Sequence, residues 1–416
     1  MMKSYELKAV FTGVSNTTIS SIFSFFGIAY ITNTLGLENA SIVFIFFFFQ
    51  GLSNFTDLGF GKYLIYIISS SDDEVEVSKG ISNFLFIVTF TLILVLSFFV
   101  VYTFLFDANE GYGIDQATWV ILGVTTIVVG YVQKIARCVL EALQLLHRQN
   151  SISLLQTVFM YFIGCMILYL FNVSAKILLI NFIIIYLLST LYTFSLIVVY
   201  LRKYSNAALI ERSTLVKFYA ASTYQVIFTL ANSSPISILR IVMQTQAVSL
   251  ETRTIVEISV KLAQTLNSVL QAFSAPLFTI FTHMHKDIAQ NEILHTVKLR
   301  FQYISLFYVM FVVIIWLCGY DLLNLVYAEN VYALSSTFIF VFMFYGTTAP
   351  VDTIVRYYWS VNNTMVPAMI RMLIPVCMLS FLSVISVFDT LALTFLFGFP
   401  IAMSSFILSA IFLIKK

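Results

Sequence analysis

Apolar residues dominate this chain in long runs, and short polar segments separate the runs. A helix needs about 20 predominantly apolar residues to cross the roughly 30 Å hydrocarbon core of a bilayer. Twelve stretches are long enough, so the pattern predicts an all-α membrane protein with twelve transmembrane helices, arranged as two six-helix bundles around a central cavity. The stretches are residues 9–31, 40–62, 81–106, 117–137, 152–172, 177–201, 215–240, 253–280, 300–318, 333–355, 364–387 and 391–414.

The eighth stretch carries its polar side chains along a single face. At 100° per residue these positions fall within one arc of about 80°. At a rise of about 1.5 Å per residue they extend over roughly 27 Å, close to the thickness of the hydrocarbon core. This polar stripe consists of Arg253, Glu257, Lys261, Gln264, Ser268 and Gln271. Such a helix is able to border apolar surroundings on one side and a wet cavity on the other.

Three further stretches have polar faces, and their positions in the chain are related. Stretches 1 and 2 become stretches 7 and 8 when the chain is shifted by six spans. We therefore predict that these four helices line the central cavity. The alternative is that their polar side chains only bond neighbouring helices. The residues concerned include Asn16, Thr17 and Ser20 in the first, Gln50, Asn54 and Asp57 in the second, and Gln225, Asn232 and Arg240 in the seventh.

A polar segment at residues 202–214 divides the chain into two halves of six spans each. We predict an N-terminal bundle at 1–201, a cytoplasmic linker at 202–214 and a C-terminal bundle at 215–416. Because six is even, both halves enter the membrane from the same side. Related halves of this kind are arranged about an axis along the membrane normal.

Composition supports the membrane assignment and narrows the function. The chain is 60% hydrophobic and 10% charged, whereas a soluble domain has about 25% charged residues. The polar loops are too short for a soluble catalytic or nucleotide-binding domain, and the GFGK sequence at 59–62 lacks the spacing of a phosphate-binding loop. His283 and His285 have no further ligands at useful spacing, and the four cysteines fit small core residues. We expect no cofactor, no metal and no nucleic-acid partner.

The distribution of basic residues predicts the orientation, because cytoplasmic loops carry an excess of Lys and Arg. With a cytoplasmic N-terminus, 17 of the 22 basic residues fall in cytoplasmic segments. The outer loops then hold Lys176 and, at their edges, Arg240 and Arg253. Both termini are expected in the cytoplasm.

Charges inside the spans need an explanation, because one at the bilayer centre costs about 2.5–3.5 kcal/mol on insertion scales. Glu257 and Lys261 are spaced i, i+4, so we expect them to pair. Asp352 and Arg356 have the same spacing near a helix end and are expected to form a structural pair.

Four basic residues are candidates for an anion site within the membrane. Lys261, Arg253, Arg240 and Arg371 would make the cavity cationic, with a phosphate or pyrophosphate head group as its natural ligand. The alternatives are that Arg240 and Arg253 are outer-surface charges, and that Arg371 reaches the interface or bonds a neighbouring carbonyl.

Two segments carry a resemblance to a known family. The sequence GLSNFTDLGFGKYLIY at 51–66 resembles the second span of the Wzx-type O-antigen flippases, and RCVLEALQLLHRQNSISLLQ at 137–156 resembles their link between spans 4 and 5. Span count, length and short loops agree along the whole chain. A departure is Arg240, where many relatives carry an acidic residue. The resemblance implies the fold of the multidrug/oligosaccharidyl-lipid/polysaccharide superfamily, in the bacterial inner membrane.

The resemblance also implies a cargo and partners. The expected cargo is an undecaprenyl-pyrophosphate-linked oligosaccharide, carried from the cytoplasmic to the periplasmic leaflet by alternating access. An O-antigen polymerase and a chain-length regulator are candidate protein partners, and membrane lipid surrounds the chain. On this hypothesis the chain is not an enzyme. Two alternatives stay open: an integral polysaccharide polymerase or glycosyltransferase, and a multidrug antiporter of the same fold.

Roles for individual residues follow from the flippase hypothesis. Lys261, with Arg253, Arg240 or Arg371, would hold the pyrophosphate. Glu257 would balance Lys261 in the empty state, and Glu257 or Asp57 would carry a coupling proton. Polar amides would contact sugars, namely Asn16, Asn54, Asn232, Gln264 and Gln271.

Overall fold

The computed structural model of this chain contains helices and connecting segments, with no strand, in the residues that it describes. These are residues 2–53, 60–70, 73–106, 112–143, 145–204, 212–245, 248–274, 277, 290–327, 331–361, 365–382 and 390–414. The helices are α1 (Met2–Leu52), α3 (Phe60–Ser70), α4 (Glu74–Phe106), α5 (Gln116–Ala142), α6 (Leu146–Phe171), α7 (Ala175–Tyr204), α8 (Arg212–Thr245), α9 (Leu250–Ala272), α11 (Gln290–Asn324), α12 (Val331–Tyr345), α13 (Thr348–Ser360), α14 (Met365–Arg371), α15 (Leu373–Leu382) and α16 (Thr390–Ile414).

The first predicted span and most of the second lie within α1. Gly36 interrupts the helix with φ 75° and ψ 160°, so two helical segments meet there. Glycine suits this position because a side chain would strain a positive φ. The second predicted span continues beyond Leu52 into α3, and residues 54–59 between them lie outside the described part. Asn54 and Asp57 fall in that interval.

The helices match the predicted spans in kind and in order. Ten helical stretches in the described residues are long and apolar enough to cross a membrane, and one of them, Val10–Leu52, covers nearly all of the first predicted span and most of the second. The helix α9 is not among the ten, since its polar stripe lowers its mean hydropathy. The predicted all-α membrane fold is confirmed.

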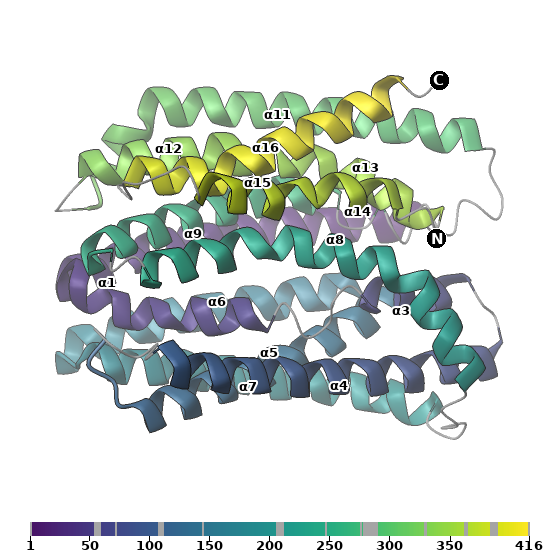
Figure 1. Cartoon of the computed structure of the whole chain (residues 1–416), viewed down its shortest axis with the longest axis horizontal. Coiled ribbons are helices and arrows are strands. Elements are labelled where there is room, and N and C mark those ends of the chain that lie inside the picture. The colour runs from purple at the N-terminus through teal and green to yellow at the C-terminus, as the bar shows by residue number, and fades with distance from the viewer. Residues whose placement is uncertain are drawn as a thin grey trace.

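The helices lie roughly side by side, with the first and second halves of the chain on opposite sides of the molecule (Figure 1). In that view the blue helices α4, α5 and α7 occupy the lower part, and the green and yellow helices α11, α12 and α16 the upper part. The helix α9 packs against both α1 and α12 and so joins the two sides. The two termini lie at the same end of the molecule. The boundary at 202–214 stays a prediction, because residues 205–211 lie outside the described part.

Large apolar side chains cover the outside of the helix assembly. Phe98 of α4, Leu188 of α7 and Trp316 of α11 are all exposed, the last at 70% of its surface. A soluble monomer rarely exposes extended apolar patches, whereas hydrocarbon chains solvate them well. This outer surface identifies a multi-pass membrane protein.

An aromatic cluster fixes the second segment of α1 against α5 and α7. Phe46 meets Phe182 and Tyr186 edge to face, with ring centroids 5.9 and 5.4 Å apart, and Phe49 meets Trp119 at 5.1 Å. Edge-to-face pairs stabilise beyond the apolar area that they bury. Successive residues of a helix are rotated by about 100° about its axis. The residue that follows Phe46 is therefore directed toward other neighbours than α5 and α7.

Candidate functional site

The polar stripe of α9 stays accessible while the rest of the helix is packed. All six stripe residues are partly or fully exposed, whereas Thr254, Ile258 and Leu262 between them are buried. Because α1 and α12 pack along α9, the stripe lies between elements from the two halves of the chain. The structure therefore concentrates the polar side chains of this helix where the two halves meet.

A pocket opens at the end of α9 that the basic residues predict to face the outside. Its cavity volume is about 50 Å³, which suits a few water molecules. Its walls come from the second segment of α1, from α5, α8 and α9, and from Tyr112 before α5. Of the four spans predicted to line a cavity, three border this pocket: span 2 (the second segment of α1), span 7 (α8) and span 8 (α9). Span 1 does not line it, and span 4 (α5) contributes instead. The lining residues are Ser41, Phe44, Ile45, Phe48, Tyr112, Trp119, Arg240, Met243, Arg253, Thr254 and Glu257.

The strongest polar contact at the pocket joins α8 to α9. The Arg240 guanidinium donates from Nε to Glu257 Oε1 at 2.5 Å and from Nη2 to Glu257 Oε2 at 2.7 Å. Only 11% of the arginine side chain and 18% of the glutamate side chain are exposed. The expected pairing of Glu257 with Lys261 was wrong for this structure. Arg240 presents two parallel donors that match both carboxylate oxygens, whereas an ammonium is a single point of charge.

Lys261 lies one turn deeper along α9 and contacts an aromatic ring. Its Nζ atom is 4.2 Å from the centroid of Phe47, within the range of a cation–π interaction. The backbone carbonyl of the same Phe47 accepts a hydrogen bond from Arg240 Nη1 at 3.2 Å. One residue of α1 thus holds a cation from α8 through its backbone and a cation from α9 through its ring.

Gly51 gives the Arg240 side chain its space beside α1. A Cβ atom placed on Gly51 would lie 2.7 Å from Arg240 Nη1, closer than a real contact permits. The clashing atom is the end of a flexible side chain, so the guanidinium would move while the helices stay in place. The glycine at this position therefore serves the geometry of the ion pair.

We predict that Gly51→Ala impairs function more than it impairs folding. Displacing Nη1 breaks its hydrogen bond to Phe47, and a hydrogen bond to a charged group contributes about 1.5–3 kcal/mol. Transport is expected to fall about tenfold or more, with a small change in melting temperature. Transport assays and thermal unfolding in detergent measure the two effects. Gly319→Ala is the matched control, because its Cβ would meet Ile315 at an ordinary 3.5 Å. Equal transport by both variants would contradict the prediction.

Arg253 lies at the pocket end of the stripe. Its Nε donates to the neutral Val248 carbonyl at 2.8 Å, and Arg253 and Tyr112 both line the pocket. Among the described residues, the ion pairs do not include Arg253. Among the described residues that line the pocket, Arg240 and Arg253 outnumber the carboxylate of Glu257, and Lys261 adds a third positive charge one turn deeper.

Arg371 is separate from this site. It is 2% exposed, and its Nη1 donates to Ser404 and Ser405 of α16 at 2.9 and 3.0 Å. It does not line the pocket, so the structure does not place it with the other predicted anion ligands. Its contacts instead join α14 to α16 inside the second half of the chain.

The predicted amide ligands also separate into different surroundings. Asn16 donates to Ser151 of α6 at 3.3 Å, which fits the alternative that it bonds a neighbouring helix. Asn232 is exposed on α8. Gln264 lies on the stripe, partly exposed, and Gln271 lies at its far end. None of these four lines the pocket.

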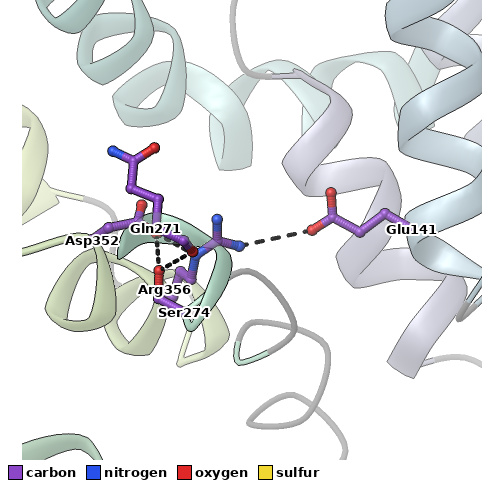
Figure 2. A network of polar contacts seen from close by, with 5 residues as sticks. All are labelled: Glu141, Gln271, Ser274, Asp352 and Arg356. Carbon is purple, nitrogen blue, oxygen red and sulfur yellow. Dashed lines mark hydrogen bonds and ion pairs between the residues drawn. The ribbon is translucent and has the colours of Figure 1, made fainter. Parts of the chain in front are cut away.

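A second polar network lies at the other end of α9 (Figure 2). Asp352 accepts from Ser274 Oγ at 2.5 Å and from Arg356 Nε at 2.6 Å, which confirms the expected i, i+4 pair. Arg356 also lies 3.9 Å from Glu141 of α5. The network therefore connects α5 of the first half with α9 and α13 of the second half, at the end opposite the pocket.

The aromatic wall of the pocket was missed by sequence reasoning. Trp119 and Tyr112 lie with ring centroids 5.5 Å apart, and Phe48 is 6.4 Å from Trp119. Aromatic residues near span ends are typical of the membrane–water interface, so the sequence offers no separate signal for them. Their role at the pocket depends on α5 packing beside α1.

Comparison with known proteins defines the fold. No protein-family model matches the chain, and no curated protein is a significant relative in sequence. Solved structures match over nearly the full length. An outward-facing multidrug resistance MATE family transporter of the MOP superfamily is 11% identical with a TM-score of 0.65, covering 98% of this chain and 94% of that one. An inward-facing structure of such a transporter is 11% identical with a TM-score of 0.62, covering 97% and 96%.

A third solved structure has a related fold and a different pocket. It is a MOP superfamily transporter from Pyrococcus furiosus, described by a reverse polarity of its binding pocket that suggests a different function. It is 11% identical with a TM-score of 0.67, covering 99% of this chain and 95% of that one. From its helices, its apolar outer surface and these full-length matches, the chain is a multi-pass membrane protein with the fold of the MATE transporters of the MOP superfamily.

Proposed function

We propose that this chain is a flippase for undecaprenyl-pyrophosphate-linked O-antigen repeat units, moving them from the cytoplasmic to the periplasmic leaflet by alternating access. The observation that carries this proposal is the excess of positive charge at Arg240, Arg253 and Lys261, beside an aromatic wall. Guanidinium and ammonium groups suit phosphate oxygens, and aromatic faces suit sugar rings. The lipid tail would stay in the bilayer during transfer.

The size of the pocket supports alternating access. Ligand pockets commonly enclose about 300–1,000 Å³, whereas this one encloses about 50 Å³. A pyrophosphate with sugars attached therefore requires the two halves to separate. Solved neighbours with this fold are described in outward-facing and inward-facing conformations, which supports such a movement here. The networks at both ends of α9 lie where such a movement would act.

The charge of the pocket favours an anionic cargo over the alternative of multidrug export. A site for cationic drugs would be acidic, whereas here Arg240 and Arg253 line the pocket together with Glu257, and Lys261 lies one turn deeper. The Pyrococcus furiosus neighbour, with its reversed pocket polarity, supports the view that this fold serves more than one kind of cargo. The polymerase and glycosyltransferase alternative has less support, because three of the solved neighbours are described as transporters. Coupling to an ion through Glu257, and partnership with a polymerase and a chain-length regulator, belong to the same proposal.

Deletion of the gene tests the proposed function directly. Surface polysaccharide should be lost, and lipid-linked repeat units should accumulate in the cytoplasmic leaflet, because synthesis continues while transfer stops. Leaflet-resolved labelling of the lipid-linked sugar measures the accumulation, and plasmid-borne wild-type chain should reverse it. Normal surface polysaccharide together with new drug sensitivity in the deletion strain would favour the antiporter instead.

A further inference from the structure

We infer that Glu257 occupies an oxyanion site on Arg240 in the substrate-free state, and that the substrate's own oxyanion displaces Glu257 onto Lys261. The inference rests on the proposed function in taking the cargo to be anionic. It identifies Glu257 as the residue that competes with the cargo for Arg240, and Lys261 as the residue that binds Glu257 once it is displaced. It also explains why a carboxylate lies within a cluster that is otherwise cationic.

The Arg240 site has the shape of an oxyanion receptor. Two of its nitrogens bind the two oxygens of Glu257 at 2.5 and 2.7 Å. Carboxylate and phosphate both present a pair of oxygens that match these parallel donors. The Glu257 carboxylate therefore stands where a substrate phosphate, or a sugar carboxylate, would make the same two bonds.

The guanidinium is held by groups other than Glu257. Its third nitrogen donates to the Phe47 carbonyl at 3.2 Å, and its central carbon lies 5.9 Å from the centroid of the Phe48 ring. Gly51 leaves the space that the same nitrogen occupies. Contacts on two neighbouring turns of α1 thus keep Arg240 oriented when Glu257 leaves. Because the Arg240 side chain is already ordered, binding of the oxyanion costs little further conformational entropy of this side chain.

A second cation is ready to receive the released carboxylate. Lys261 follows Glu257 by four residues, so the two side chains project from neighbouring turns of one helix. They are close enough to interact electrostatically. The Lys261 ammonium contacts the Phe47 ring, and a carboxylate is a stronger partner than an aromatic face. A change of side-chain rotamers would move Glu257 between the two cations while the backbone stays in place.

This exchange makes the site selective for charge and for shape. An anion with paired oxygens replaces both bonds that Arg240 loses, whereas a neutral sugar replaces neither. A neutral or cationic molecule would leave the Arg240–Glu257 pair closed. Selection of the anionic end of a lipid-linked saccharide would therefore precede any contact with its sugars.

Binding to the purified full-length chain in detergent tests the exchange. The probes are farnesyl diphosphate for the lipid phosphate and glucuronate for a sugar carboxylate. Glu257→Gln should bind its preferred probe about tenfold more tightly than the wild type, because the internal competitor has lost its charge. Glu251→Gln, in the exposed first turn of the same helix, is the matched control and should bind like the wild type. The probe that responds identifies the source of the oxyanion.

A second variant avoids the risk that an unpaired Arg240 disturbs folding. Lys261→Met keeps the Arg240–Glu257 pair and removes the receiving cation, so probe binding should weaken about tenfold. In the charge exchange Arg240→Glu with Glu257→Arg, the ion pair is restored with reversed polarity. It should fold and yet fail to bind the probes or to transport, because the guanidinium then projects from α9 and lacks the Phe47 carbonyl and the space at Gly51 that orient it in the wild type.

The outcomes separate this inference from the proposed function. Transport at the wild-type rate by the charge-exchanged chain would show a purely structural pair and overturn the inference. Unchanged probe affinity in Glu257→Gln, with transport intact in the wild type, would overturn the exchange and leave the flippase standing. Tighter probe binding by Glu257→Gln would support the exchange. If the wild-type chain at the same time did not transport lipid-linked saccharide, the flippase proposal would be overturned while the exchange stood.

Discussion

Replacing Lys261 with methionine is expected to stop transport while leaving the fold intact. Methionine keeps the length and apolar stem of the side chain and removes the ammonium that lies 4.2 Å from the Phe47 ring. In the bound state the ammonium makes a hydrogen bond to an anion, either the cargo or the displaced Glu257 carboxylate, and such a bond contributes about 1.5–3 kcal/mol, so its loss should reduce the rate about 10–100-fold. Flipping of lipid-linked repeat units in reconstituted vesicles measures the rate, and surface polysaccharide reports it in cells.

The control for this substitution is Lys176→Met, which removes an exposed basic side chain at the start of α7. It should transport like the wild type, because it lies outside the pocket. Both variants should reach the membrane in normal amounts. Normal surface polysaccharide from cells that carry Lys261→Met in the membrane would refute the role of Lys261 in holding cargo.

Replacing Arg240 with alanine is expected to have the largest effect on stability. It leaves the Glu257 carboxylate, only 18% exposed, without the two donors that now bind it. Removing one partner of a buried ion pair costs about 3 kcal/mol or more, because the remaining charge is uncompensated. Lys261, one turn away, is the nearest replacement and would recover part of this loss. Thermal unfolding in detergent measures the change, and transport should be lost as well.

A double substitution distinguishes the ion pair from simple loss of packing. Arg240→Ala combined with Glu257→Ala should be more stable than Arg240→Ala alone, because no charge is then left without its partner. Two independent packing defects would instead add. Equal or greater instability of the double variant would therefore show that the pair contributes little and that Arg240 acts mainly by filling space.

The candidate site was only partly predictable from the sequence. The polar stripe of α9 followed from periodicity, and its exposure between buried residues agrees with that pattern. The partner of Glu257 did not follow. Residue spacing identified Lys261 on the same helix, and the structure supplies Arg240 from the neighbouring helix. Spacing along one helix is a local property, whereas the rotation of α8 against α9 depends on the packing of the whole assembly.

The same reason accounts for the other differences. Arg371 carries the charge that a cavity needs, and its helix directs it toward Ser404 and Ser405. Trp119 belongs to a span with no polar stripe, and it reaches the pocket because α5 packs beside α1. Charge and hydropathy are read residue by residue. Which side chains share a space is decided by how each helix is turned toward its neighbours.

The sequence by itself determined the membrane character, the order of the helices and the polar face of α9. These follow from runs of apolar residues and from a repeat of 3.6 residues, both of which are encoded within single segments. The tertiary structure decided that Arg240, Glu257 and Lys261 meet around Phe47, and that Arg371 lies elsewhere. Contacts between helices arise from burying many side chains at once, so no single segment contains them.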